Sequence, residues 1–400
     1  MPDIRRLVVT GAGTVLSGDL AEPVLPGVDT VVCRDGTIAA VGTATGLAAQ
    51  IAAADQVLDA HGSTVAPGLV DSHCHVAFGD YTPRQQAVGF LGSYLHGGVT
   101  TAISAGEVHV PGRPRDREGV KAMAVAAQRC FRDFRPSGMR VYAGCVLLEP
   151  ELTESDFADL AERGVRLAKF GFGRYADPMD GVPQLRWARR HGLVVTCHAG
   201  GASVPGSASV TAEHVLALDP DVCGHANGGP TALPDADVDR LVLDSGVVLQ
   251  IVQAGNLRAA VRLARLASDT GNLHRLVLGS DTPSGVGVIP LALLKTVAEL
   301  SSLAGLDPAV TWALATGNCA TVWGLPAGRL RVGAVADLLV LDAPVGSAAR
   351  DALGALAAGD LPGVSAVVTA GALRVLGSRN TPRATRAATA SPPTIATADR

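Results

Sequence analysis

TVAPGLVDSHCH, residues 64–75, is the stretch of the sequence that best predicts the fold. An apolar run leads directly into His73 and His75, and in a β-strand the residues i and i+2 point to the same side. Both imidazoles can therefore face one metal ion from the end of a buried strand. A lone His-x-His pair is more often two hydrogen-bonded or surface histidines, so this interpretation needs support from the rest of the chain.

That support comes from polar residues that end later strand-like runs at a regular spacing. Lys169 ends one run, and His198 and His225 end the next two after 29 and 27 residues. A further run ends near Gln253, and the next one ends near Asp281, 28 residues later. A period near 28 fits one strand, one helix and two loops, as in successive βα units. Three more units fit between residues 75 and 169, so the predicted fold is a (β/α)₈ TIM-like barrel.

The two ends of the chain predict a smaller β domain. Short β-branched or apolar runs, separated by turn signals such as Asp35-Gly36, occur near both ends of the chain. The expected organisation is a composite β domain of sandwich type from residues 1–63 and 326–382, a hydrolase barrel from 64–325, and a disordered tail from 383–400 that is rich in Ala, Thr and Pro.

Composition restricts the class of protein. With 400 residues, 48% hydrophobic and 18% charged, the chain can bury a large core. A net charge of -4 gives no reason to expect nucleic acid or a membrane surface as partner. No apolar run reaches the roughly 18 residues that span a bilayer, and the N-terminus lacks the pattern of a secretory signal. Seven scattered cysteines argue against a disulfide framework, so we expect a cytoplasmic protein.

Each candidate metal ligand has a plainer explanation when it is taken alone. His198 and His225 could be hydrogen-bonded core histidines, Asp281 a helix N-cap, and Lys169 an ion-paired lysine. However, only three of the 33 basic residues are lysines, which suggests that the amine of Lys169 itself matters. A neutral amine can react with carbon dioxide to give a carbamate, an anionic bridge between two cations. Together these residues predict a metal site, because active sites of such barrels lie at the carboxyl ends of the strands.

Over essentially its whole length, the chain resembles the amidohydrolase superfamily. Residues 64–75 are similar to the first-strand signature of that superfamily, and the flanking motifs are at 97–101, 317–318 and 333–338. Stretches outside the metal motif resemble the enamidase family, which opens the cyclic amide 6-oxo-1,4,5,6-tetrahydronicotinate. These stretches are 79–85, 104–106, 111–114, 227–231, 281–285 and 378–382.

The resemblance implies a binuclear metal site with these ligands: His73, His75 and Asp281 for the first ion, His198 and His225 for the second, and Lys169, carboxylated by carbon dioxide, as the bridge. Enamidases resemble this pattern except at the bridge, where they have an acid. The superfamily uses either group, so Lys169 keeps the bridge but leaves the metal preference open. Zinc, iron and manganese all suit these ligands.

The resemblance also implies a mechanism. Asp281 would carry the proton from the attacking water to the leaving nitrogen, and the products would be 2-formylglutarate and ammonia. The superfamily resemblance also implies a homo-oligomer.

Substrates of the enamidase type carry a carboxylate, and loop arginines are candidates to bind it. Arg84 and Arg113 follow the first and second barrel strands, where either could make a bidentate contact; both could equally be solvated surface residues. His109 and Gln253 are weaker candidates for substrate contact. The same site could serve a hydantoinase, a lactamase, a lactonase or a ring deaminase. A non-enzymatic barrel would lack the ligands, all of which are present.

Overall fold

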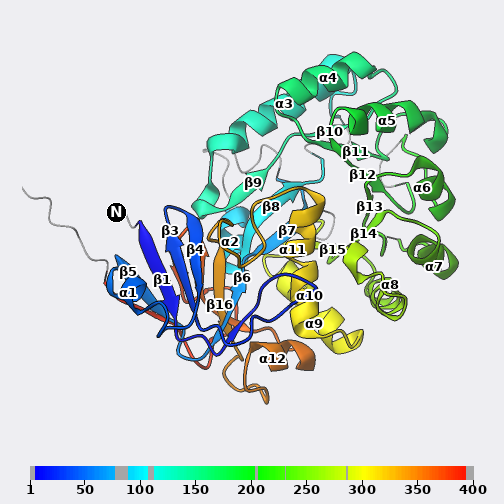
Figure 1. The fold of residues 1–400 in the computed structure, drawn as a ribbon. Helices are drawn as coiled ribbons and strands as arrows, with labels where there is room; N and C mark the ends of the chain where they lie inside the picture. The colour runs from blue at the N-terminus through cyan, green and yellow to red at the C-terminus, as the bar shows by residue number, and fades with distance from the viewer. Residues whose placement is uncertain are drawn as a thin grey trace, which may run out of the picture.

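The computed structural model describes residues 5–76, 89–106, 112–202, 206–229, 231–284 and 287–392. In Figure 1 the middle of the chain forms a ring of strands wrapped by helices. A smaller β domain, drawn in blue and orange to red, lies beside it and is built from both ends of the chain. This arrangement is the predicted one.

Parallel strands follow one another around the ring in chain order. They are β7 (Leu69–Cys74), β8 (Val99–Ser104), β9 (Arg140–Tyr142), β10 (Cys145–Leu147), β11 (Leu167–Phe170), β12 (Val194–His198), β13 (Val222–Gly224), β14 (Val248–Val252) and β15 (Leu276–Gly279).

The third strand of the ring is bent rather than continuous. Its first half, β9, pairs with β8, and its second half, β10, pairs with β11. Gly144 lies between the halves at a φ of +94°, and a Cβ there would approach the Cβ of Gln128 to 2.6 Å. The strand thus bends where it lies against Gln128 of the preceding helix. With β9 and β10 counted as one, the described strands β7 to β15 fill the eight predicted positions.

The ring closes where its last strand meets its first. The backbone N–H of Asp281 donates to the carbonyl of His73 at 2.7 Å, and the N–H of His75 donates to the carbonyl of Thr282 at 3.0 Å. These bonds place the carboxyl end of β7 against the residues that follow β15. Ligands from the two ends of the barrel sequence therefore become neighbours.

Helices cover the outside of the ring (Figure 1). The barrel helices are α2 (Phe90–His96), α3 (Arg117–Asp133), α4 (Glu154–Glu162), α5 (Val182–Arg190), α6 (Ala212–Leu218), α7 (Asp235–Leu243), α8 (Leu257–Asp269), α9 (Ala292–Leu303), α10 (Pro308–Leu314) and α11 (Gly317–Val322). Inside the ring, a buried apolar layer that includes Val70, Leu167 and Val277 fills the half of the barrel nearest the strand starts. The other half is left to polar side chains.

The β domain consists of two five-stranded sheets in the described residues. Its strands are β1 (Arg6–Thr10), β2 (Thr14–Val15), β3 (Thr30–Arg34), β4 (Thr37–Gly42), β5 (Gln56–Asp59), β6 (Thr64–Pro67), β16 (Leu338–Asp342), β17 (Gly363–Thr369), β18 (Ala372–Leu376) and β19 (Thr389–Ala390), and its helices are α1 (Ala48–Ala52) and α12 (Ala352–Ala358). Leu7 of one sheet and Val65 of the other belong to one apolar core, as in a sandwich. Asp35 and Gly36, at φ angles of +46° and +82°, form the expected hairpin turn.

Two predicted boundaries are wrong. Residues 64–67 form β6, which pairs with β16 and β2, so they belong to the β domain and not to the barrel. The tail expected to be disordered from residue 383 is part of the same domain up to 392. Its strand β19 pairs with β5, and Arg386 forms an ion pair with the buried Asp342. Composition alone could not reveal pairing over such a separation, and residues 393–400 lie outside the described ones.

A buried carboxylate ties α3 to α4. Asp156 accepts hydrogen bonds from the backbone of Thr153 at 2.8 Å, from Arg117 at 2.8 Å and from Lys121 at 3.0 Å. Burial alone would raise the pKa of Asp156, but these hydrogen bonds outweigh it and lower the pKa to about 2. This cluster fixes one helix pair on the outside of the barrel.

None of the helices among the described residues has the length and apolar character needed to cross a bilayer. All seven cysteines are free thiols.

Candidate metal centre

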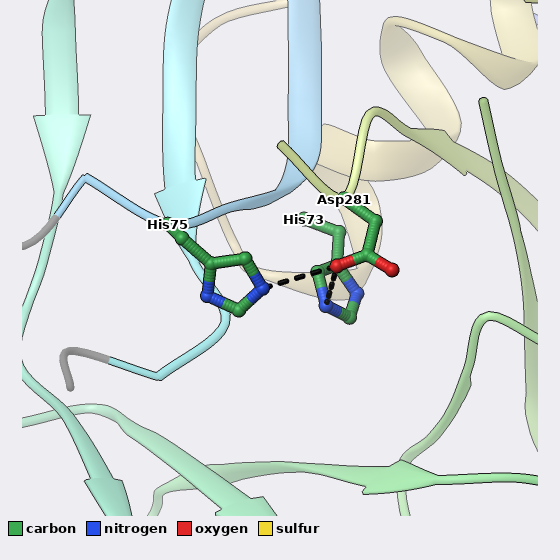
Figure 2. A group of neighbouring side chains, drawn as sticks. All are labelled: His73, His75 and Asp281. Carbon is green, nitrogen blue, oxygen red and sulfur yellow. Dashed lines mark hydrogen bonds and ion pairs between the residues drawn. The ribbon is translucent and has the colours of Figure 1, made fainter. Parts of the chain in front are cut away.

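Three of the predicted ligands converge at the junction of β7 and β15. Figure 2 shows the side chains of His73, His75 and Asp281 pointing toward one another. The Oδ1 of Asp281 lies 3.0 Å from Nε2 of His75 and 3.4 Å from Nε2 of His73. Atoms that bind one ion at about 2.0–2.2 Å lie about 3–4 Å from each other. The spacing of the three side chains therefore suits a single divalent cation.

Local backbone geometry makes this convergence possible. Asp281 has a φ of +55°, a left-handed conformation that Asp tolerates better than most residues. The chain turns sharply there and directs the carboxylate back over β7. At Gly279 an added Cβ would come within 2.7 Å of the Cβ of His73, so only glycine lets β15 approach β7 this closely. The glycine belongs to the site although it carries no side chain.

The other three predicted ligands form a second group beside the first. Nδ1 of His198 lies 3.1 Å from Nε2 of His225, and Nζ of Lys169 lies 3.5 Å from Nε2 of His73. The rings of His73 and His225 have centroids 5.5 Å apart. At Gly171, with a φ of +108°, a Cβ would come within 2.5 Å of the Cβ of His198. All six predicted ligands thus meet at the carboxyl ends of the barrel strands.

The side chain of Gln250, on β14, orients the ring of His73. Its Nε2 donates to the carbonyl of Ser72 at 3.0 Å, so its Oε1 is the atom that faces Nδ1 of His73 at 2.5 Å. Because Oε1 can only accept, Nδ1 carries the hydrogen and the lone pair lies on Nε2. The same Oε1 also accepts from the backbone N–H of His225 at 3.4 Å. One amide therefore links the two groups of ligands.

Backbone carbonyls select the tautomers of two further histidines in the same way. Nδ1 of His75 donates to Gly106 at 3.2 Å, and Nε2 of His198 donates to Gly201 at 2.8 Å. The opposite nitrogens, Nε2 of His75 and Nδ1 of His198, then turn lone pairs toward the carboxylate and toward His225. The lone pair on Nε2 of His75 and the carboxylate of Asp281 repel unless a cation lies between them, whereas Nε2 of His225 can donate to Nδ1 of His198. The donor set fits divalent metal ions on this ground.

Protonation states point to the same conclusion. Burial, and after it the charges of neighbouring groups such as Lys169, hold the pKa values of His73 and His225 well below the usual range and lower that of His198 to about 4. Burial would raise the pKa of Asp281, but the surrounding imidazoles outweigh this and hold it below its usual range. At neutral pH the site thus offers neutral imidazoles and a carboxylate, the forms that bind metal.

Lys169 is fully buried beside these groups. Burial lowers the pKa of its ammonium, although Asp281 opposes the shift. In the part of the chain that the structure describes, no carboxylate lies within ion-pair distance of Nζ. The ring of Phe172 is 5.7 Å away, and a Cβ at Gly224 would be only 3.2 Å away. Burial therefore disfavours the ammonium form of Lys169 relative to a lysine in water.

The structure describes two of the four residues that the sequence predicted to contact the substrate. Arg84 and His109 lie outside the described residues. Arg113 is buried, and its guanidinium donates to Glu149 at 2.5 Å and to the carbonyl of Phe172 at 2.9 Å. The expectation that Arg113 offers a free guanidinium to a substrate therefore needs correction.

The amide of Gln253 is likewise engaged away from the ligands. It accepts from Thr296 at 2.7 Å and donates to Glu299 at 3.3 Å, both on α9. The described contacts of Gln253 therefore fix a helix against the barrel.

Two supporting residues escaped the sequence analysis. Asp71 accepts from the backbone N–H groups of His73 at 3.1 Å and Ser280 at 2.9 Å, and burial raises its pKa to about 6. Gln250, the other one, is the polar residue in the middle of an otherwise apolar strand. Side chains alternate along a strand, so Gln250 shares the inward face with Val248 and Val252, whereas Gln253 falls on the other face. This alternation could have identified Gln250 from the sequence.

A parallel barrel with imidazole, carboxylate and amine groups gathered at its strand ends defines a metal-dependent hydrolase of the amidohydrolase class. The pattern of the Amidohydrolase family matches residues 64–373, and the chain belongs to this family. Membership implies catalysis that depends on divalent metal ions.

Within the family, the chain is similar to enamidase. It is 46% identical to the enamidase of Eubacterium barkeri over 387 residues, which cover 96% of this chain and 99% of that protein. A crystal structure of enamidase superposes with a TM-score of 0.92 at 45% identity, covering 96% of this chain and 100% of the other. The imidazolonepropionase of Salinispora tropica is 26% identical over 78% of this chain and 86% of its own length.

Proposed function

We propose that this protein is a cyclic amidohydrolase of the enamidase type, which converts 6-oxo-1,4,5,6-tetrahydronicotinate to 2-formylglutarate and ammonia. The observation that carries the proposal is the 46% identity to an enamidase over nearly the full length of both chains. The convergence of six candidate metal ligands at one end of the barrel supports it.

His73, His75 and Asp281 would hold one divalent ion, and His198 and His225 would hold a second. Zinc, iron and manganese suit this set of imidazoles and carboxylate. When bound, the two ions would polarise the amide carbonyl and make a bound water acidic enough to supply hydroxide at neutral pH. The tautomers imposed by Gln250 and by the backbone carbonyls support this assignment, because they present lone pairs to the ions.

Lys169 would bridge the ions as a carbamate. Its amine would add to carbon dioxide and lose one proton, which forms a nitrogen–carbon bond and leaves one negative charge on the new carboxylate. Burial, the lowered pKa and the lack of an ion-pair carboxylate among the described residues all support an amine that is neutral and therefore reactive. Incubation of the protein with carbon-13-labelled bicarbonate, followed by carbon-13 NMR, tests whether the carbamate forms. A carbamate resonance that is absent from Lys169→Arg is expected.

Asp281 is the residue placed to move the proton. Its carboxylate would accept a proton from the water that attacks the amide carbon and would deliver it to the ring nitrogen as the C–N bond breaks. The freed nitrogen is part of an enamine, which tautomerises to an imine. A second water then hydrolyses the imine to the aldehyde and ammonia. The low pKa of Asp281 keeps the carboxylate in the accepting form at the start of the cycle.

The carboxylate of the substrate requires a cationic partner. Because Arg113 is engaged with Glu149, we propose Arg84 for this role, with His109 as an accessory contact. Arg84→Met is expected to raise KM by about tenfold or more, the loss expected for one charge-assisted contact. Arg34→Met, which changes an exposed arginine of the β domain, serves as its control. A cytoplasmic homo-oligomer remains our prediction for the native state.

The test is the release of ammonia and an aldehyde from 6-oxo-1,4,5,6-tetrahydronicotinate by the metal-loaded enzyme. Stoichiometric formation of both products supports the proposal. Turnover of a hydantoin, an unsubstituted lactam, a lactone or an aminated ring, without turnover of this substrate, would replace it by another hydrolase on the same centre.

A further inference from the structure

A cavity lies at the opposite end of the barrel from the candidate metal centre. It has a volume of about 530 Å³ and is lined by residues at the starts of β9, β11 and β12 and by the turn that follows α11. The starts of parallel strands lie together at one end of a barrel and their ends at the other. At about 3.3 Å per residue, Val194 at this cavity is about 13 Å along β12 from His198 at the metal centre. The two sites are therefore separate.

Four arginines line the cavity, and no acidic side chain of the described residues belongs to its lining. Among the described residues, the guanidinium groups of Arg135 and Arg166 donate to backbone carbonyls. The Nε of Arg140 is buried and has no hydrogen-bond partner among the described residues. In the part of the chain that the structure describes, Arg132 forms an ion pair with its exposed neighbour Asp133. The cavity thus has guanidinium donors to spare, in the fork geometry that matches a carboxylate or phosphate.

Apolar and aromatic groups form the rest of the wall. Tyr142 and Trp323 are half-buried and pack against the apolar layer inside the barrel, while Phe131, Leu167 and Leu325 complete the lining. Flat aromatic walls favour a planar ring, since stacked and edge-on ring contacts add to the gain from burying apolar surface. A free inorganic anion would leave most of this wall in contact with water. The volume also falls within the range of small-molecule sites.

We propose that this cavity binds a small aromatic anion, in which a planar ring contacts Tyr142 and Trp323 and a carboxylate or phosphate is held by Arg140 and Arg166. The site is distinct from the metal centre and does not depend on the proposed function. Benzoate and phenyl phosphate are the probes, because they share the benzene ring and differ in the anionic group.

Calorimetric titration of the metal-loaded enzyme with each probe tests the proposal. We expect at least one probe to bind at one per chain with a Kd below about 1 mM. Arg166→Gln and Arg140→Gln are each expected to weaken binding about tenfold or more, the loss expected for a charge-assisted contact. Arg129→Gln, an exposed arginine on the same helix as Arg132 but outside the lining, is the matched control and is expected to bind as wild type.

The outcome of the two titrations also identifies the anionic group. Binding of benzoate alone assigns a carboxylate, and binding of phenyl phosphate alone assigns a phosphate. Arg166→Gln is the principal variant, because the side chain of Arg166 is exposed and its loss should disturb the fold little. Burial raises the pKa of Asp337 and the charge of Arg140 opposes this shift, so Arg140→Gln also changes the surroundings of that carboxyl. Absence of binding by both probes overturns the proposal. Binding that survives in Arg166→Gln and Arg140→Gln but is lost in Lys169→Ala would place the ligand at the metal centre and overturn it as well.

Discussion

Replacing Arg113 by methionine is expected to destabilise the protein strongly. Its side chain and that of Glu149 are only 1% and 2% exposed, and the ion pair between them is 2.5 Å long. Glu149 also accepts from the backbone of Arg174 at 2.9 Å, and Arg113 donates to Phe172. The pair thus fastens the segment before α3 to the loops that follow β10 and β11. Removing one partner of such a pair leaves a buried charge unpaired, which costs about 3–5 kcal/mol.

The size of the effect can be expressed as a melting temperature. At about 2.1 cal/mol/K per residue, a chain of 400 residues has an unfolding entropy of about 0.8 kcal/mol/K. A loss of about 3–5 kcal/mol therefore lowers Tm by about 4–6 °C. In the double variant Arg113→Met/Glu149→Leu both charges are removed, so we expect at least half of the lost stability to return.

Differential scanning calorimetry of the metal-loaded enzyme measures these shifts. Arg163→Gln is the control, because it breaks an ion pair at the surface. The side chain of Arg163 is 53% exposed and that of its partner Asp159 is 32% exposed. Such a surface pair contributes about 1 kcal/mol or less, so Tm is expected to fall by about 1 °C at most. A wild-type Tm for Arg113→Met, or a double variant as unstable as the single one, would refute the reasoning. A raised KM with unchanged Tm would return Arg113 to the role of substrate contact.

Three further changes test the ligand frame and its surroundings. Gln250→Leu removes the acceptor that orients His73, so we expect metal affinity, measured by chelator competition, to fall about 10–100-fold; unchanged affinity would show that the ring needs no such partner. Gly171→Ala would force a Cβ to within 2.5 Å of the Cβ of His198, and metal analysis is expected to show loss of the second ion, whereas full occupancy would contradict the packing argument. The pKa of Asp156 is about 2 in the folded protein and about 4 in the unfolded chain. Its ionised form therefore stabilises the folded protein above about pH 4. This contribution, about 2 kcal/mol, is lost as the pH falls toward 2. The stability gap between wild type and Asp156→Asn in urea titrations should therefore narrow toward zero over that window, and a constant gap would rule the account out.

The barrel could be predicted from the sequence because two features indicate the same fold. These are the regular spacing of the strand-like runs and the type of residue that ends them. The period near 28 residues locates the strands, and a buried strand that ends in histidine, lysine or aspartate is chemically conspicuous. The structure brings Lys169, His198 and Asp281 together because the ends of parallel strands share one face of a barrel. Closure between β7 and β15 then makes neighbours of residues that are far apart in the sequence.

The errors arose where long-range packing decides the role of a residue. Gln250 lies in the middle of β14 and Gln253 directly follows that strand, and only the alternation of side chains places Gln250 inside the barrel. The partner of Arg113 is Glu149, in the loop that follows β10, and no local pattern in the sequence indicates this pairing. Likewise, the pairing of β19 with β5 joins segments at opposite ends of the chain.

Metal content measured together with hydrolysis of 6-oxo-1,4,5,6-tetrahydronicotinate tests the central claim most directly. Wild-type protein, loaded with zinc or iron in the presence of bicarbonate, is predicted to carry two metal ions per chain and to release ammonia. Lys169→Ala and Asp281→Asn are predicted to bind less metal and to lose turnover. A folded wild-type protein that retains no stoichiometric metal after this loading would contradict the account.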